Sequence, residues 1–245
     1  MLHLILALQV NLLLAAVAAV LRLPSIWGVA ACVPIGLAFM HYAGTEGYAP
    51  FAACATIGVF VGLVERPTRS FATANAAGHV APGLATAGGL AQIDLPARHA
   101  KAAHSAFSAG NVIASFLPPV ALAAFWDFLP DPDPCHAAVI AGIAAVAGNA
   151  ASAACVQPRR IKPTFGGGVT AVAAGSLVAL AACAGGGMLF AHVWVVMTAM
   201  AGASLCFSLI ASASRRNTGV VVWLANVVSS GIACTAAGGL AWAAR

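Results

Sequence analysis

The sequence predicts an all-α, polytopic integral membrane protein, and three observations support this fold class. First, 62% of its 245 residues are hydrophobic, only 7% are charged, and the mean hydropathy is +0.96. No soluble globular domain has this composition. Second, the apolar residues form runs of membrane-spanning length, since one helix needs about 20 mostly apolar residues to cross the hydrocarbon core. Third, Lys and Arg gather in the short segments between these runs.

Eight apolar segments follow one another with short connections, and we expect each to form a spanning helix. The first run lacks the basic start of a secretory signal peptide, and it is longer than the apolar region of such a peptide. The chain has no room for a separate catalytic domain, so we treat residues 1–245 as a single transmembrane domain. The predicted segments are 2–21, 25–41, 49–64, 103–126, 136–156, 167–186, 188–213 and 218–243.

The charges predict how these helices are oriented, because cytoplasmic loops of membrane proteins are enriched in Lys and Arg. The loop at 42–50, the loop at 127–135 and the turn near 187 carry acidic residues or no charge, so we expect them outside. This alternation places both termini on the outer side of a bacterial inner membrane. The expected cytoplasmic residues are Arg22, Arg66, Arg69, Arg98, Lys101, Arg159, Arg160, Lys162, Arg215 and Arg216.

The segment 71–91 is long enough to cross but is flanked by basic residues on both sides. A full crossing there would invert every later loop. We therefore expect a re-entrant or surface-lying segment, and its Gly and Pro content suits irregular backbone that protein or a water-filled cavity covers.

A few polar side chains inside the apolar runs are the candidate functional residues, since such groups are costly in a bilayer and usually face the bundle interior or a hydrated path. His104 begins the fourth segment, and Asn111 lies two turns further on the same face. Asn149, Asn226 and Ser229 lie within later helices. Histidine titrates near neutral pH, so with water, amides and hydroxyls it is able to form a proton relay.

Simpler roles remain open for each of these residues. Asparagines often join membrane helices by hydrogen bonds, and His104 lies near enough to the interface to extend its side chain to water. His79 has a possible role in capping a turn. Cys135 and His136 lack paired ligands at a recognised spacing, so we predict no metal site.

The glycine runs do not predict a nucleotide site. The run FGGGVT at 165–170 lacks the GK[ST] ending of a phosphate loop, and GGG at 185–187 matches no dinucleotide fingerprint. We therefore expect no cofactor in this chain. The basic residues lie in short loops, which gives no support to nucleic-acid binding.

Three stretches carry a resemblance to a known family. They are DLPARHAKAAHSAFSAG at 94–110, AGNAASAACVQPRRIKP at 147–163 and MTAMAGASLCFSLIASASRRNTGVVVWLANVVSSGIACTAAGG at 197–239. Together they resemble the membrane domain of the beta subunit of proton-translocating NAD(P) transhydrogenase. The resemblance covers about 94–239, whereas the first 93 residues agree in helix count and scarcely in sequence.

The resemblance implies roles for particular residues. His104 would be the proton-channel histidine and Asn226 its polar partner, with proton passage coupled to hydride transfer between NAD(H) and NADP(H) on soluble partner domains. We expect the chain to depart from the family in four ways: Asn217 replaces an Asp, Gly148-Asn149 replaces Gly-Ser, the last helix and the NADP(H)-binding domain are lacking, and the insertion at 71–91 is unusual. These departures put energy conversion by this chain alone in doubt.

The resulting prediction is a transhydrogenase-like proton-translocation domain, at most the membrane subunit of an enzyme. We expect a homo- or hetero-oligomer in the lipid bilayer, with nucleotide-binding subunits at the cytoplasmic loops. One alternative is a small-solute transporter or channel built around His79, and another is a structural subunit of a membrane complex. The predicted coupling residues are Arg159, Arg160, Lys162, Arg215, Arg216 and Asn217.

Overall fold

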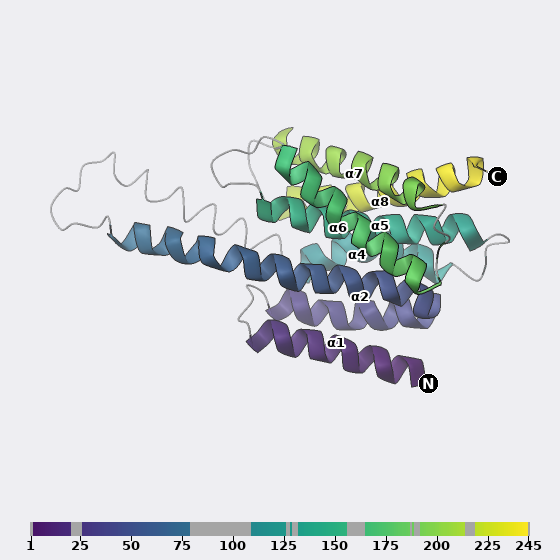
Figure 1. Cartoon of the computed structure of the whole chain (residues 1–245), viewed down its shortest axis with the longest axis horizontal. Coiled ribbons are helices and arrows are strands. Elements are labelled where there is room, and N and C mark those ends of the chain that lie inside the picture. Colours follow the sequence, from purple (N-terminus) through teal and green to yellow (C-terminus); the bar gives the residue numbers. More distant parts are fainter. Residues whose placement is uncertain are drawn as a thin grey trace.

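A computed structural model describes residues 2–20, 26–78, 109–125, 128, 132–155, 165–186, 188, 192–213 and 219–244, and these residues form a helical bundle with no strand (Figure 1). This confirms the predicted all-α class for the described part of the chain. The helices are α1 (Leu2–Val20), α2 (Ile26–Gly78), α4 (Ala109–Ala124), α5 (Pro132–Cys155), α6 (Phe165–Ala184), α7 (Val193–Ala213) and α8 (Gly219–Ala243).

The long element α2 is a hairpin of two helical limbs. Gly44 has φ 59° and ψ −152°, a conformation that is essentially restricted to glycine. Phe39 and Phe51 lie on either side of it with ring centroids 5.5 Å apart, whereas twelve residues of straight helix would separate them by about 18 Å. Phe116 of α4 packs edge-on against both rings. The chain therefore turns back within the loop predicted at 42–50.

The second limb of α2 runs further than the apolar segment predicted at 49–64. It continues to Gly78 and so includes the first eight residues of the predicted re-entrant segment 71–91, which are helical. The sequence indicated where apolar composition stops, and a helix does not have to end at that point. Residues 79–91 lie outside the described part.

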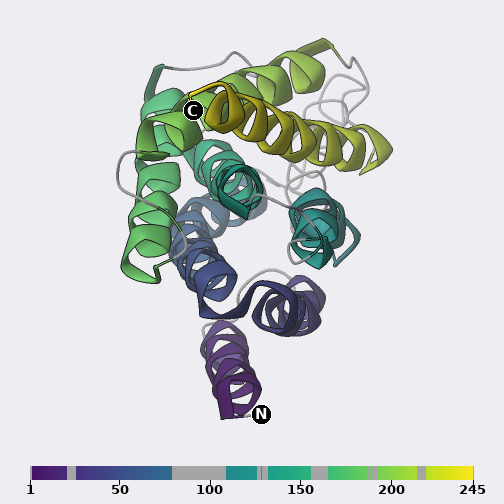
Figure 2. The same cartoon turned by 90° about the vertical axis from the view of Figure 1, so that its right-hand side faces the viewer.

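The core of the bundle surrounds α5, which packs against α2, α4, α6, α7 and α8. Figure 2 shows α5 in teal at the centre of these helices and α1 in purple at the edge. Val139, Ile140 and Ile143 of α5 are fully buried. Small residues permit the close approach, because a Cβ at Gly142 would lie 2.5 Å from Cys234 Sγ of α8.

Within the described residues, three helical stretches are long and apolar enough to cross a membrane: Leu2–Val20, Asp133–Ala151 and Trp223–Ala243. Val112–Ala124, Val169–Ala184 and Val193–Phe207 are shorter apolar helices. The chain thus has the character of a membrane protein, and the count of eight crossings stays a prediction.

The helix ends fall into two groups. The Gly44 end of the bundle contains the α2 turn, the last residues of α4 and α6, the first residues of α5 and α7, and both termini (Figure 1). Two contacts fix this grouping: His136 Nδ1 lies 3.9 Å from Glu46 Oε2, and a Cβ at Gly185 would lie 2.8 Å from that of Ala49. These are the connections that the charge pattern groups on one side.

The opposite Gly219 end contains the last residues of α1, α5 and α7 and the first residues of α2, α6 and α8 (Figure 1). The Cys135 thiol lies 3.8 Å from the Leu122 carbonyl, so α4 finishes at the Gly44 end and must begin toward the Gly219 end. The second limb of α2 also finishes toward the Gly219 end. The chain therefore leaves α2 and enters α4 at the same end of the bundle.

Candidate functional site

Asn149 is the centre of a buried polar cluster that joins three helices. Its side chain is 6% exposed on α5, where alanine and glycine neighbours leave room for other helices to approach. The amide Nδ2 donates to Ser229 Oγ of α8 at 2.9 Å, and the amide Oδ1 accepts from the Ser204 hydroxyl of α7 at 3.3 Å. One asparagine thus links the central helix to two neighbours.

The hydrogen bonds continue along α8. The Ser229 hydroxyl, which is fully buried, donates to the backbone carbonyl of Asn226 at 3.2 Å. Ser204, Asn149, Ser229 and the Asn226 carbonyl therefore form a chain in which every donor points the same way, and we call these four residues the polar chain. The neighbouring Ser230 is also fully buried but donates only within its own helix in the described part, to the Asn226 carbonyl at 2.9 Å.

The Asn226 side chain is 9% exposed. Its carboxamide makes no hydrogen bond to any residue in the part of the chain that the structure describes. A buried amide normally finds a partner, and none of the described residues serves as one for this carboxamide. It is the place at which the cluster has capacity to receive water or another polar group.

The cluster lies nearer to the Gly219 end than to the Gly44 end. Asn149 comes six residues before Cys155, and Asn226 comes seven residues after Gly219. At the helical rise of 1.5 Å per residue, both lie roughly 10 Å from the ends of their helices. The predicted basic loops connect these same helix ends. The cluster therefore lies inside the bundle near the Gly219 end, which is the end at which the sequence predicts a partner.

The structure brings together three of the five predicted pathway residues: Asn149, Asn226 and Ser229. Asn111 lies in the first turn of α4, and its side chain is outside the described part. His104 and His79 also lie outside it. The same holds for the predicted coupling residues Arg159, Arg160, Lys162, Arg215, Arg216 and Asn217.

A second buried polar site was missed from the sequence. Asn11 of α1 is 3% exposed, its Nδ2 donates to the Val33 carbonyl at 3.4 Å, and its Oδ1 accepts from the Tyr48 hydroxyl at 3.1 Å. The same hydroxyl lies 3.2 Å from the Ala7 carbonyl. These bonds hold α1 against both limbs of α2. The available signal was an asparagine in the middle of the apolar run 2–21.

Ser204 was missed as well, because a serine in an apolar helix has no distinguishing neighbour in the sequence. Its bond to Asn149 joins residues 55 positions apart. Only the packing of α7 against α5 reveals it.

The cluster can orient hydroxyls and amides but cannot itself store a proton. Ser and Asn side chains do not titrate near neutral pH. Movement of a proton through this part of the bundle therefore requires water or a titratable group beside the cluster. Among the described residues no group of three His, Cys, Asp or Glu side chains is placed to hold a metal ion.

No protein-family model matches the chain, and no curated protein and no solved structure is significantly similar to it.

Proposed function

We propose that the chain is an eight-span bundle of a bacterial inner membrane that provides a transmembrane path for protons, with the polar chain as its fixed polar centre. The observation that carries the proposal is the Asn149 contact with Ser229 and Ser204, a hydrogen-bonded connection between three apolar helices. Polar side chains are rare inside membrane helices and commonly line ion or proton routes.

In this proposal His104 is the group that takes up and releases the proton. Imidazole is suited to this step because its unperturbed pKa lies near neutral pH. Asn226 offers its carboxamide to water or to the imidazole, while Ser229 and Asn149 hold α8 in place beside it. The proposal rests on the sequence resemblance for His104 and on the described contacts for the other residues.

The nucleotide-binding partner follows from the same resemblance. Such a partner would bind at the Gly219 end, where the basic loops provide positive charge, and NAD(H) and NADP(H) would be bound by partner chains. The residues proposed to contact it are Arg159, Arg160, Lys162, Arg215, Arg216 and Asn217.

A structural subunit is the second candidate, and one observation favours it. Both polar atoms of the Asn149 amide are paired with hydroxyls of neighbouring helices, which is the arrangement that stabilises helix association in membranes. In that case the polar chain holds the bundle together and conducts nothing.

Proton flux in liposomes distinguishes these functions. The purified chain is reconstituted with a pH-sensitive dye inside the vesicles and a K⁺ diffusion potential across the membrane. We expect a flux that His104→Gln abolishes and that the matched His79→Gln variant preserves. Loss of flux in His79→Gln alone would instead indicate the transporter, and absence of flux in all three proteins, each shown to be folded by circular dichroism, would favour the structural role.

Ser229 and Ser230 supply an internal control for the same assay. Both are fully buried and adjacent, but in the described part only Ser229 bonds to another helix. Ser229→Ala should reduce flux more strongly than Ser230→Ala. Equal effects would contradict a specific role for the polar chain.

A further inference from the structure

A shallow groove lies between α1 and the first limb of α2. It has a volume of about 530 Å³ and is largely open on one side. Its lining residues are Leu4, Ile5, Leu8, Pro34, Leu37, Ala38, His41 and Tyr42.

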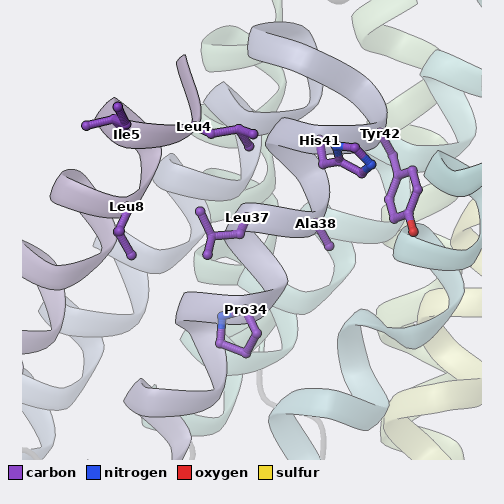
Figure 3. A pocket seen from close by; sticks show the side chains of 8 residues that line it. All are labelled: Leu4, Ile5, Leu8, Pro34, Leu37, Ala38, His41 and Tyr42. Carbon is purple, nitrogen blue, oxygen red and sulfur yellow. The ribbon is translucent and has the colours of Figure 1, made fainter. Parts of the chain in front are cut away.

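The groove is apolar along its length and polar at one end. Figure 3 shows Leu8 of α1 opposite Pro34 and Leu37 of α2, with His41 and Tyr42 beyond them. Pro34 and His41 are seven residues apart, or about 10 Å along the helix. This arrangement matches an amphipathic molecule whose chain lies on the leucines and whose polar group meets the two rings.

The polar end of the groove lies at the Gly44 end of the bundle, where the predicted outer loop 42–50 meets the expected membrane–water interface. His41 and Tyr42 immediately precede the Gly44 turn, and their ring centroids are 4.9 Å apart. The Tyr42 side chain is 42% exposed and His41 is exposed as well. An imidazole N–H and a phenol O–H so placed are able to donate to the same phosphate group.

The helix α1 leaves this groove open to the bilayer. Only 17% of its apolar stretch Leu2–Val20 is buried, and in the described part α1 packs mainly on α2. We infer that the groove binds one phosphoglycerolipid, with an acyl chain against Leu8 and Leu37 and its phosphate hydrogen-bonded by His41 and Tyr42. The inference rests on the proposed membrane location but not on proton conduction.

The two parts of the lipid contribute differently to binding. An acyl chain gains little by moving from other acyl chains into an apolar groove, because both surroundings are equally apolar. Selective retention must therefore depend on the fit of the groove and on the bonds to the phosphate. Loss of a charge-assisted hydrogen bond weakens binding by about tenfold or more.

Native mass spectrometry of the full chain in mild detergent tests this site with phosphatidylglycerol and diacylglycerol as probes. We expect one bound phosphatidylglycerol and about tenfold weaker retention of diacylglycerol, which lacks the phosphate. The double variant His41→Gln, Tyr42→Phe should lose this preference while still binding diacylglycerol. A wild-type chain that does not discriminate between the two lipids would overturn the inference.

A second pair of variants tests the groove itself. Leu8→Trp places a large side chain in the groove. Leu13 is 65% exposed and does not line the groove, so Leu13→Trp places the same side chain elsewhere on α1. Only Leu8→Trp should abolish lipid retention. Equal retention in both variants, or a dimer of this chain that Leu8→Trp dissociates, would contradict the lipid assignment. Proton flux is a separate measurement, so failure here is distinguishable from failure of the proposed path.

Discussion

Ser229→Ala should weaken the bundle measurably, whereas Ser230→Ala should not. The first substitution removes the acceptor of the Asn149 Nδ2 hydrogen bond at 2.9 Å, and the second removes a hydroxyl that bonds to its own helix in the described part. The perturbation is small and equal in volume, because each variant deletes one buried hydroxyl from the same turn of α8.

The magnitude follows from the contacts that each hydroxyl makes. Hydrogen bonds between membrane helices are worth about 0.6 kcal/mol on average and up to about 1.7 kcal/mol. Ser229→Ala also leaves a buried N–H of Asn149 unpaired, so we expect a loss of about 1–2 kcal/mol in the free energy of unfolding. The Asn226 carbonyl keeps Ser230 as a donor and adds little to this cost. Ser230→Ala should cost less than about 0.5 kcal/mol.

A double-mutant cycle isolates the bond between the two side chains. Asn149→Leu keeps the branched shape of the side chain without its polar atoms, and it is combined with Ser229→Ala and, as the control, with Ser230→Ala. Reversible unfolding by sodium dodecyl sulfate in mixed micelles, followed by circular dichroism, gives each free energy. We expect a coupling energy of about 0.6–1.7 kcal/mol for the first pair and none for the second. A coupling below about 0.3 kcal/mol for the first pair would refute the reasoning.

Three further predictions concern α1 and α2 and use the same unfolding assay. Gly36→Ala should destabilise the chain by about 1–3 kcal/mol, because its new Cβ would collide with the Asn11 amide and lie 2.6 Å from the Phe51 ring. Tyr48→Phe should cost about 1 kcal/mol through loss of the hydroxyl that bonds to Asn11, and an unchanged stability would show that this bond contributes nothing. Gly44→Ala should cost about 1–3 kcal/mol, since alanine is strained at φ 59°, and a neutral result would contradict the turn geometry.

Gly58→Ala is the matched control for the Gly36 substitution. Both glycines lie in α2, but among the described residues no atom outside the adjoining backbone of the helix lies within 4 Å of a Cβ at Gly58. Alanine favours helix by up to about 1 kcal/mol over glycine, so this variant should be neutral or slightly more stable. If it destabilises the chain as much as Gly36→Ala, close packing at Gly36 is not the cause.

Composition and charge predicted much of the architecture. Apolar runs predicted helices, and each described helix overlaps one or two of those runs. The bounds differ in places: α2 is also helical through 42–48 and continues to Gly78, and α5 and α6 begin at Pro132 and Phe165, before the predicted starts at 136 and 167. The charges of the connections predicted which of them lie at the same end of the bundle. Both inferences depend on the apolar composition or the charge of a single segment, and these can be read from the sequence without knowing which segments are in contact.

Contacts between helices could not be predicted in this way. Asn149 and Ser229 are 80 positions apart, and hydropathy does not specify which apolar helices are neighbours or how each is rotated. The same limit applies to Asn11 and Tyr48, which meet only because α2 turns at Gly44 and brings its second limb beside α1. A polar residue in an apolar run indicates that a partner exists, and the fold decides which residue that partner is.

The position of the two termini has a practical consequence. Both lie at the Gly44 end, opposite the helix ends that the basic loops connect (Figure 1). A tag or surface anchor attached to either terminus would therefore leave the Gly219 end unobstructed. Immobilising the chain in this manner presents to solution the face at which a soluble partner is proposed to bind.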